Sequence, residues 1–452
     1  MKKYLALLIA LALVFTGFIG DAKAEEGTLF TDRDLAQEAD MTGAESIQLS
    51  GQSVTIDHAG VFVLSGEIEN GQITVEAGDE DKVQLVLSGV TIRQETGAAI
   101  QVKSADKVFI TLAQGSENTL CSESITEDGV DGVIFAKTDL TLGGPGKLTI
   151  LSQQGHGIVC KDTLAITGGN YDIQAAGHGI SGKDGLNIAD GTFAITTGGG
   201  STAAQMKASD AAGMGWGPWE TSGQTEGESV KAKGLKSDGP INVLFGNFTL
   251  DCADDALHAG GNVSISGGSW SIRSADDGIH SDLDVTISGG SFEIPYCYEG
   301  IEGKNVTISC DRLNITSTDD GINATGEDAD FRVPGMDNGA IITVEGGDIT
   351  IVSDGDCLDS NGSILLNGGE LDLTCNGNGN TALDSESGVT NNGAQVTTND
   401  GSENGGGFGR GQMGGGRGQF PGGGKEGGGF PGDGQFPEDM QFPEDGQFPK
   451  KK

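Results

Sequence analysis

Pairs of acidic residues recur in this chain at a fixed interval, each just before an aliphatic residue. Asp276 and Asp277 precede Ile279, and the equivalent pair Asp254 and Asp255 stands 22 residues earlier. A fixed period means that each copy repeats one piece of structure, so its carboxylates line up in space. Calcium takes roughly six to eight oxygen ligands, many of them from carboxylates. The spacing therefore predicts a row of carboxylates that can hold calcium.

Two positions of the repeat carry most of this chemistry, one before and one after the central aliphatic residue. The carboxylates expected to hold calcium are Asp254, Asp255, Asp276, Asp277, Glu299, Glu302, Asp319, Asp320, Asp356 and Asp359. The polar side chains expected to contact a carbohydrate are His258, His280, Lys236, Tyr298 and Asn323. No residue is assigned a catalytic role.

Carboxylates on neighbouring units need compensation for their charge. Paired strands lie about 4.8 Å apart, and two negative charges at that distance repel by ~3.5 kcal/mol at an effective dielectric constant of about 20. The repulsion is relieved if the carboxylates point into solvent, keep a proton or share a cation. Calcium fits the row best, and the structural alternative is a solvated acidic face on a secreted protein.

Short β-strands are expected to position this row. The central residues of successive units are Ile158, Ile180, Leu235, Leu257, Ile279, Ile301, Ile322, Leu358 and Leu383. Apolar and polar residues alternate within a unit, as in Val285-Thr286-Ile287, and a period of two is typical of strands. A unit of about 22 residues with three short strands corresponds to one turn of a parallel β-solenoid. A leucine-rich repeat has a different consensus, and a β-sandwich has no fixed period.

The two ends of the chain differ in composition from the repeats. Residues 1–24 have a basic start, an apolar run and a small-residue cleavage site, so we expect a secretory signal peptide. Residues 25–398 are the predicted solenoid, in which 26–44 are expected to cap the end and 198–231 to form a surface loop. Residues 399–452 are rich in glycine and Phe-Pro pairs, which predicts a disordered tail.

The charge balance narrows the classes of partner. The chain of 452 residues has 26 basic and 66 acidic residues, which gives a formal net charge of −40. Nucleic-acid binding is not expected, because phosphates require a basic surface. An acidic surface attracts cations, either alone or as a bridge to an acidic polymer. The seven cysteines contain no C-x-x-C pair, and we expect most of them to be small buried apolar residues.

Five segments share the pattern of one known family. They are Asp276-Asp277-Gly278-Ile279-His280-Ser281-Asp282, Tyr298-Glu299-Gly300-Ile301-Glu302-Gly303, Asp319-Asp320-Gly321-Ile322-Asn323, Lys233-Gly234-Leu235-Lys236 and Gly78-Asp79-Glu80-Asp81-Lys82-Val83-Gln84-Leu85-Val86-Leu87. In these segments the chain resembles secreted bacterial carbohydrate-binding domain-containing proteins. The resemblance implies a right-handed parallel β-helix of about 22 residues per coil, similar to pectate lyases in fold. It also implies binding of calcium and of acidic polysaccharides such as polygalacturonate, or of cellulose. Cys310-Asp311 and Cys357 depart from the pattern, where glycine is usual.

Three functions are compatible with these features. The first is secreted, non-catalytic, calcium-dependent binding of an acidic polysaccharide or a plant cell-wall glycan. The second is a calcium-dependent polysaccharide (pectate) lyase, in which Lys236, Arg273 or Lys304 would remove the proton beside the uronate carboxylate. The third is a structural or adhesive surface protein that calcium stiffens.

The binding function is favoured because no convincing base stands among the acidic residues. We expect a monomer that is secreted and is extracellular or associated with the cell surface. We expect no nucleic acid among its partners, and no membrane once the signal peptide is removed.

Overall fold

The computed structural model describes residues 28–126, 129–202, 232–326, 338–377 and 379–400. The predicted signal peptide, and all but a few residues of the predicted loop and tail, lie outside these ranges. Within them the chain is all-β apart from the four-residue helix α1 (Asp32–Leu35). No helix among these residues has the length and apolar character needed to span a membrane.

Thirteen short strands form one parallel sheet, which we call the short-strand sheet. In order along the sheet they are β2 (Val54–Ile56), β4 (Ile73–Glu76), β6 (Ile100–Ser104), β9 (Gly132–Ala136), β12 (His156–Cys160), β15 (Ile180–Gly182), β18 (Leu235–Ser237), β21 (Leu257–Ala259), β24 (Ile279–Ser281), β27 (Ile301–Gly303), β29 (Ile322–Ala324), β31 (Leu358–Ser360) and β34 (Leu383–Ser385). Central aliphatic residues pair with one another, as Leu257 does with Ile279 and Ile279 with Ile301. Equivalent positions of successive units therefore lie side by side.

The other 23 strands form a second sheet that consists of two parallel ladders. The first ladder contains β7 (Lys107–Leu112), β10 (Asp139–Gly143), β13 (Thr163–Ile166), β16 (Gly185–Ile188), β19 (Ile241–Val243), β22 (Val263–Ile265), β25 (Asp284–Ile287), β32 (Ser363–Leu366) and β35 (Gly388–Asn391). The second contains β8 (Glu117–Ser122), β11 (Lys147–Ser152), β14 (Asn170–Ala175), β17 (Thr192–Thr197), β20 (Asn247–Cys252), β23 (Ser269–Ser274), β26 (Ser291–Cys297), β33 (Glu370–Cys375) and β36 (Gln395–Asn399).

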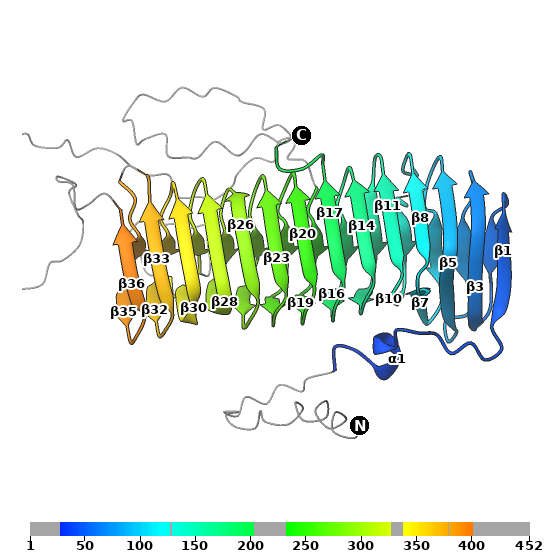
Figure 1. The fold of residues 1–452 in the computed structure, drawn as a ribbon, viewed down its shortest axis with the longest axis horizontal. Coiled ribbons are helices and arrows are strands. Elements are labelled where there is room, and N and C mark those ends of the chain that lie inside the picture. Colours follow the sequence, from blue (N-terminus) through cyan, green and yellow to red (C-terminus); the bar gives the residue numbers. More distant parts are fainter. Residues whose placement is uncertain (1–27, 127–128, 203–231, 327–337, 378, 401–452) are drawn as a thin grey trace, which may run out of the picture. The chain divides into compact units, whose positions relative to one another are not determined.

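Long strands join the two ladders into one sheet. The remaining members are β1 (Glu45–Ser50), β3 (Gly60–Glu69), β5 (Lys82–Gln94), β28 (Asn305–Ser317) and β30 (Ile341–Ser353). Strand β5 pairs with both β7 and β8, β28 with both β25 and β26, and β30 with both β32 and β33. The strands are stacked in chain order between β1 and β36 (Figure 1).

The predicted right-handed parallel β-helix, with three separate short strands in each coil of about 22 residues, requires correction. The strands belong to two sheets of 23 and 13 members, because the backbone of β5, β28 and β30 stays extended where the repeat predicted a turn. The period is not uniform either, since the paired residues Ile100 and Ile134 lie 34 residues apart, against 22 for Leu257 and Ile279. The chain forms a stack of parallel strands in two sheets, and the 22-residue spacing holds only over part of it.

The hydrophobic core contains buried side chains from both sheets, and burial follows the predicted alternation. In β24 and β25 the inward Ile279, Val285 and Ile287 are buried, whereas Thr286 is exposed. One inward row of the second ladder is aromatic and consists of Tyr171, Phe193, Phe248, Trp270 and Phe292. Their rings are stacked, with centroid separations of 5.2, 4.8, 3.7 and 5.7 Å in chain order. This row adds ring contacts to the hydrogen bonds that hold the register.

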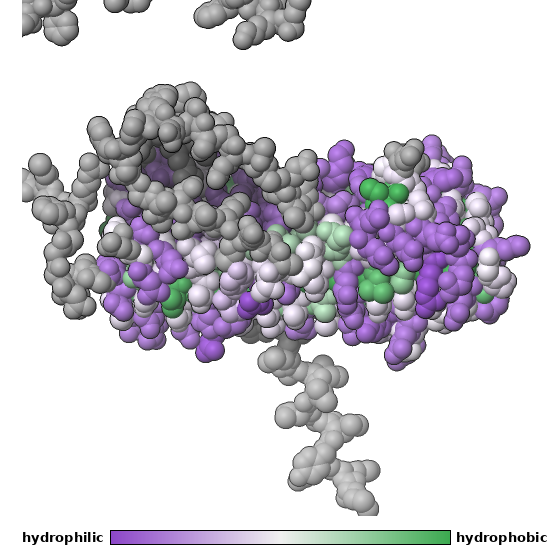
Figure 2. All heavy atoms as spheres, turned by 90° about the horizontal axis from the view of Figure 1, so that it is seen from above, coloured by the Kyte–Doolittle hydropathy of each residue, from purple (hydrophilic) through white to green (hydrophobic). Residues whose placement is uncertain are grey.

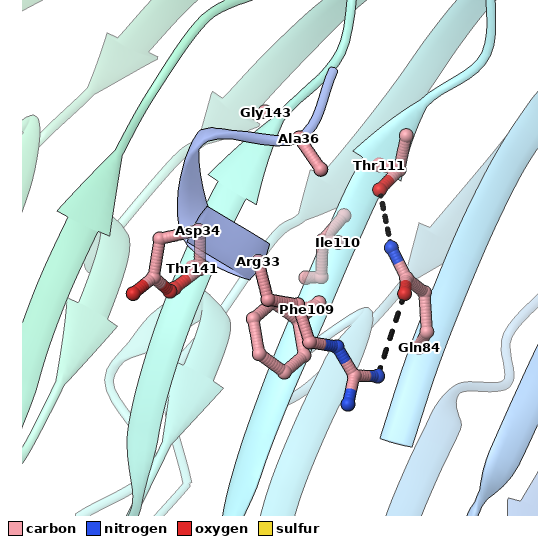
Figure 3. Close-up of a pocket in the computed structure, with 9 residues that line it drawn as sticks. All are labelled: Arg33, Asp34, Ala36, Gln84, Phe109, Ile110, Thr111, Thr141 and Gly143. Carbon is pink, nitrogen blue, oxygen red and sulfur yellow. Dashed lines mark hydrogen bonds between the residues drawn. The ribbon is translucent and has the colours of Figure 1, made fainter. Parts of the chain in front are cut away.

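Helix α1 packs against the side of the first ladder, so the prediction that residues 26–44 cap the end of the solenoid is wrong. The Asp34 carboxylate lies 2.8 Å from Lys107 Nζ on β7 and accepts a 2.6 Å hydrogen bond from Thr141 on β10. Burial raises the pKa of Asp34, but the hydrogen bonds from Lys107 and Thr141 outweigh it and lower the pKa to about 2. Beside it, Gln84 donates to Thr111 and accepts from Arg33 (Figure 3).

The surface of the described part of the chain carries few large apolar side chains. Figure 2 shows a mostly hydrophilic face with small, separate hydrophobic patches. Within the described ranges, the large exposed apolar residues are Leu29, Leu35, Met41, Ile125, Phe245, Leu283, Ile341 and Val389. All seven cysteines are free thiols, and six are buried while Cys121 is half-buried, which confirms that most of them are apolar packing residues.

Candidate metal and glycan site

The short-strand sheet places the position after each central residue in a single row. Parallel pairing puts Lys236 beside His258, His258 beside His280, and His280 beside Glu302. The row continues through Asn323 to Asp359. The spacing in the sequence predicted these neighbours correctly, because each strand pairs with the equivalent strand of the next unit.

The second predicted row, two positions before each central residue, has a structural task that sequence reasoning missed. Asp255 Oδ1 accepts the backbone N–H of Asp277 at 3.2 Å, and Asp277 Oδ1 accepts that of Glu299 at 3.3 Å. Asp320 Oδ1 likewise accepts the N–H of Asp356 at 2.7 Å. One oxygen of each of these carboxylates thus satisfies a backbone donor in the next turn.

Histidines at the same position of earlier units perform the same task. His156 Nδ1 accepts the N–H of His178 at 2.7 Å, and His178 Nδ1 accepts that of Lys233 at 3.0 Å. Burial lowers the pKa of His178 to about 3, with the neighbouring His156 and Lys236 acting in the same direction, so the ring stays neutral. A signal was present in the sequence, since His156, His178, Asp255 and Asp277, which all carry an acceptor atom, occupy the same position of the repeat.

The second oxygen of the first two carboxylates faces a cationic side chain. Lys233 Nζ contacts Asp255 Oδ2 and lies 3.0 Å from Asp254 Oδ1. Asp255 Oδ2 is also 2.8 Å from His258 Nδ1, and Asp277 Oδ2 is 3.0 Å from the Nδ1 atom of the next histidine, His280. Sequence reasoning treated these acids as free ligands, whereas the structure gives them a lysine and two histidines as partners.

The pKa values of these acids are shifted in opposite directions, and burial raises the pKa of Asp277 to about 7 in spite of its bond with His280. Burial raises the pKa of Asp255, but His258 and Lys233 outweigh it and hold the pKa well below its usual range. Burial, together with the charges of Asp277, Glu302 and Asp320, raises the pKa of Glu299 to about 10.

The acids beyond Glu299 follow the same trend. Burial, with the charges of Asp359, Asp319 and Asp356, raises the pKa of Asp320 to about 8. Burial raises the pKa of Asp356 to about 6. Neighbouring carboxylates act in the same direction as burial on the pKa values of both Asp320 and Asp356.

Three groups of side chains have ligand atoms close enough to share one metal ion. They are Asp254, Asp255 and Asp276; Asp255, His258 and His280; and Asp277, His280 and Glu302, with all ligand atoms of a group within 4.8 Å of one another. The predicted ligands Glu299, Asp319, Asp320, Asp356 and Asp359 belong to none of these groups among the described residues. The preformed geometry therefore lies at the beginning of the predicted site.

The predicted carbohydrate contacts are mostly engaged with carboxylates. Lys236 Nζ contacts Asp238, and Asn323 Nδ2 donates to Glu299 Oε2 at 3.2 Å. Tyr298 lies half-buried in the turn before β27. The carboxylates of both rows, from Asp254 to Asp359, are together called the acidic row. These side chains lie along it, and their role towards a sugar stays a prediction.

Two of the candidate bases for a lyase reaction do not lie in this row. Arg273 is on β23 of the second sheet, with its guanidinium 5.1 Å from the ring centre of Tyr296. Lys304 follows β27, where its backbone N–H donates to Leu283 O. Of the three candidate bases, only Lys236 lies in this row, and its ammonium is paired with Asp238.

An open groove of about 350 Å³ lies over β11, β14 and β17, away from the acidic row. Its lining residues are Leu151, Ser152, Gln153, Gln174, Ala175, Ala176, Thr196 and Gly199. Sequence reasoning missed this groove, because no motif or periodic acid marks it.

A family model for carbohydrate-binding domain-containing proteins matches residues 50–216, 217–278 and 275–406. The chain belongs to this family. A carbohydrate-binding domain-containing protein of Acetivibrio thermocellus is 32% identical over 186 residues, which cover 38% of this chain and 65% of that protein. The chain thus spans just under two thirds of the curated relative it matches.

One solved structure is also similar, that of the polysaccharide lyase-like protein from C. thermocellum in a gadolinium derivative. The match covers 78% of this chain and 93% of the chain in that structure, with 20% sequence identity and a TM-score of 0.28. This similarity is too low to support a conclusion about the fold or activity of the present chain. The family membership, which the resemblance of the repeats predicted, rests on the family model.

Proposed function

We propose that this protein is a non-catalytic binding protein for an acidic polysaccharide, and that calcium held by the acidic row links the protein to uronate carboxylates. The observation that carries the proposal is the group of half-buried acids Glu299, Asp320 and Asp356, whose pKa values are raised to about 10, 8 and 6. Carboxylates crowded in this way gain most from a divalent cation, which removes their mutual repulsion. Membership of a carbohydrate-binding family supports a glycan as the partner.

The donor set fits calcium in its chemistry. Calcium prefers oxygen ligands in flexible geometry, and each unit from Glu299 onward supplies carboxylates. The backbone bond to Asp356 occupies Asp320 Oδ1, and Oδ2 is not needed for that bond. We propose Glu299, Asp319, Asp320, Asp356 and Asp359 as the main calcium ligands. In the earlier units, Lys233 stands at the carboxylates of Asp254 and Asp255.

Calcium bound there would leave coordination positions for the carboxylate oxygens of a polyuronate. The protein side would fix the row of carboxylates at the strand spacing of about 4.8 Å and supply neighbouring hydroxyl and amide groups for hydrogen bonds. Such an arrangement holds a polymer without any proton transfer, which agrees with the absence of a free base in the described part of the row.

The test is binding of polygalacturonate by titration calorimetry in millimolar calcium and again with chelator. We expect binding in calcium and at least a tenfold loss with chelator, and a further loss in the double variant Glu299→Gln/Asp320→Asn. Asn keeps the Oδ1 acceptor for the Asp356 N–H, so the fold is retained. The control is Asp348→Asn on β30, whose carboxylate lies exposed beside Arg312.

Binding that persists unchanged in chelator would contradict the proposal. If calcium raises the melting temperature but no polysaccharide binds, the protein is a calcium-stiffened structural protein instead. Release of unsaturated products, measured by their absorbance at alkaline pH, would show a lyase. We also propose a secreted, monomeric protein, which fractionation of the culture and light scattering would test.

A further inference from the structure

One histidine in the acidic row faces two carboxylates from two different strands. His280 on β24 has its Nδ1 atom 3.0 Å from Asp277 Oδ2 and 2.9 Å from Glu302 Oε2 on β27. We propose that Asp277, His280 and Glu302 form a site for a divalent transition-metal ion of the zinc class, separate from any calcium site. The proposal does not depend on glycan binding and goes beyond the proposed function.

The distances between the donor atoms suit one small ion. Ligands about 2.0–2.1 Å from a zinc ion lie roughly 2.8–3.0 Å from each other in octahedral geometry and roughly 3.3–3.4 Å in tetrahedral geometry. The two nitrogen-to-oxygen distances of 3.0 and 2.9 Å match the octahedral separation and are shorter than the tetrahedral one. Small rotations of the Glu302 side chain, which is about one fifth exposed, would open the cluster to the required size.

The chemical type of the donors selects the class of metal. Calcium binds oxygen atoms, whereas an imidazole nitrogen with two carboxylates suits zinc, nickel or copper. Without a metal, Nδ1 of His280 carries at most one proton and faces two carboxylates. A divalent ion at this point would interact favourably with both carboxylates at once.

Neighbouring groups already hold the ligands in position. Asp277 Oδ1 accepts the N–H of Glu299 at 3.3 Å, which leaves Oδ2 pointing toward His280. On the far side of the ring, His280 Nε2 lies 3.4 Å from Asp282 Oδ1. A carboxylate on the second ring nitrogen fixes the tautomer in which Nδ1 is the metal ligand. This arrangement is the usual support of a metal-bound histidine.

The site also has an accessible face. The His280 and Glu302 side chains are 23% and 21% exposed, whereas Asp277 is 6% exposed. The stacked ring of His258 lies next to the cluster, with ring centroids 4.8 Å apart, and its Nδ1 is held by Asp255. We assign His258 to this neighbouring pair and not to the ion.

The experiment measures zinc binding by the full chain prepared without an affinity tag. After dialysis against zinc and then against metal-free buffer, we expect about one zinc per chain by elemental analysis. We expect titration calorimetry to show that a hundredfold excess of calcium leaves this binding unchanged. His280→Asn and Glu302→Gln are each expected to weaken binding at least tenfold, since a ligand is lost. Asn is tolerated in this row, where Asn323 pairs with Glu302.

A matched control is His58→Asn. His58 also lies between two carboxylates, 2.8 Å from Asp57 and 3.4 Å from Glu45, but on an exposed surface, so zinc binding should not change. His280→Asp gives an all-oxygen cluster and should exchange zinc preference for calcium preference.

Three results would overturn the proposal. They are a chain that retains no zinc, equal zinc binding by the His280→Asn variant, and displacement of zinc by equimolar calcium. Folding of each variant is checked by its melting temperature. Because zinc binding is measured without polysaccharide, its failure is distinct from a failure of calcium-dependent glycan binding.

Discussion

Replacement of Lys233 by methionine should destabilise the protein, and calcium should restore part of the loss. The Lys233 ammonium lies 3.0 Å from Asp254 Oδ1 and also contacts Asp255 Oδ2. The three side chains are only 15%, 10% and 4% exposed. Methionine keeps the length of the aliphatic chain, so the variant removes the charge and leaves the packing largely intact.

The magnitude follows from leaving buried carboxylates without their cation. At 3.0 Å and an effective dielectric constant of about 20, the attraction is ~5.5 kcal/mol. Loss of one partner of a buried ion pair typically costs about 3 kcal/mol or somewhat more. With an unfolding entropy of ~2.1 cal/mol/K per residue over roughly 370 residues, 3 kcal/mol corresponds to a fall in Tm of about 4 °C.

The assay is differential scanning calorimetry of Lys233→Met in chelator and in millimolar calcium. We expect a fall of about 4 °C in chelator and a smaller fall in calcium, because a divalent ion can take the position that the ammonium leaves. Lys236→Met is the matched control, since its partner Asp238 is 58% exposed and such pairs contribute about 0–1 kcal/mol.

Two outcomes would refute this reasoning at different points. An unchanged melting temperature in chelator would show that the Lys233 ion pair contributes no stability. A fall that is the same in calcium and in chelator would show that calcium does not enter the cluster of Asp254 and Asp255, while leaving the ion pair intact.

Two further predictions concern stability. Glu299 and Asp320 have pKa values raised to about 10 and 8 in the fold, so the folded state binds more protons than the unfolded state between about pH 4 and pH 8. In chelator the melting temperature should therefore fall as pH rises through this window, and calcium should flatten the curve; a melting temperature that rises over the same window would contradict the assignment. Trp270 is buried between Phe248 and Phe292, with ring centroids 3.7 and 5.7 Å away, so Trp270→Ala should cost about 3–5 kcal/mol. Trp270→Phe keeps a stacked ring and should cost clearly less in urea denaturation, and equal losses would show that stacking contributes little.

The sequence correctly predicted which residues become neighbours in the rows, whereas the β-helix that it predicted for the fold is wrong. The alternation in Val285-Thr286-Ile287 correctly gave the buried and exposed faces, because side chains of a strand point to opposite sides. The sheet topology was not readable, since whether β28 bends or stays extended between Ile308 and Leu313 depends on its neighbours β26 and β30.

The acidic repeat by itself determined which residues become neighbours. Equal spacing and parallel pairing bring His258, His280 and Glu302 into one row wherever the strands form. Only the tertiary structure decided what each carboxylate does. Asp277 divides its two oxygens between a backbone N–H in the next turn and the ring of His280, and this division depends on side-chain orientation.

The compensating charge was likewise decided in three dimensions. The central residues Ile180 and Leu235 are 55 residues apart, and Lys233 stands near the end of this long interval. It nevertheless pairs with the acids of the next unit. The physical reason is that ion pairs form between atoms a few ångströms apart, and a linear period specifies the strand neighbours without specifying which of their charges meet.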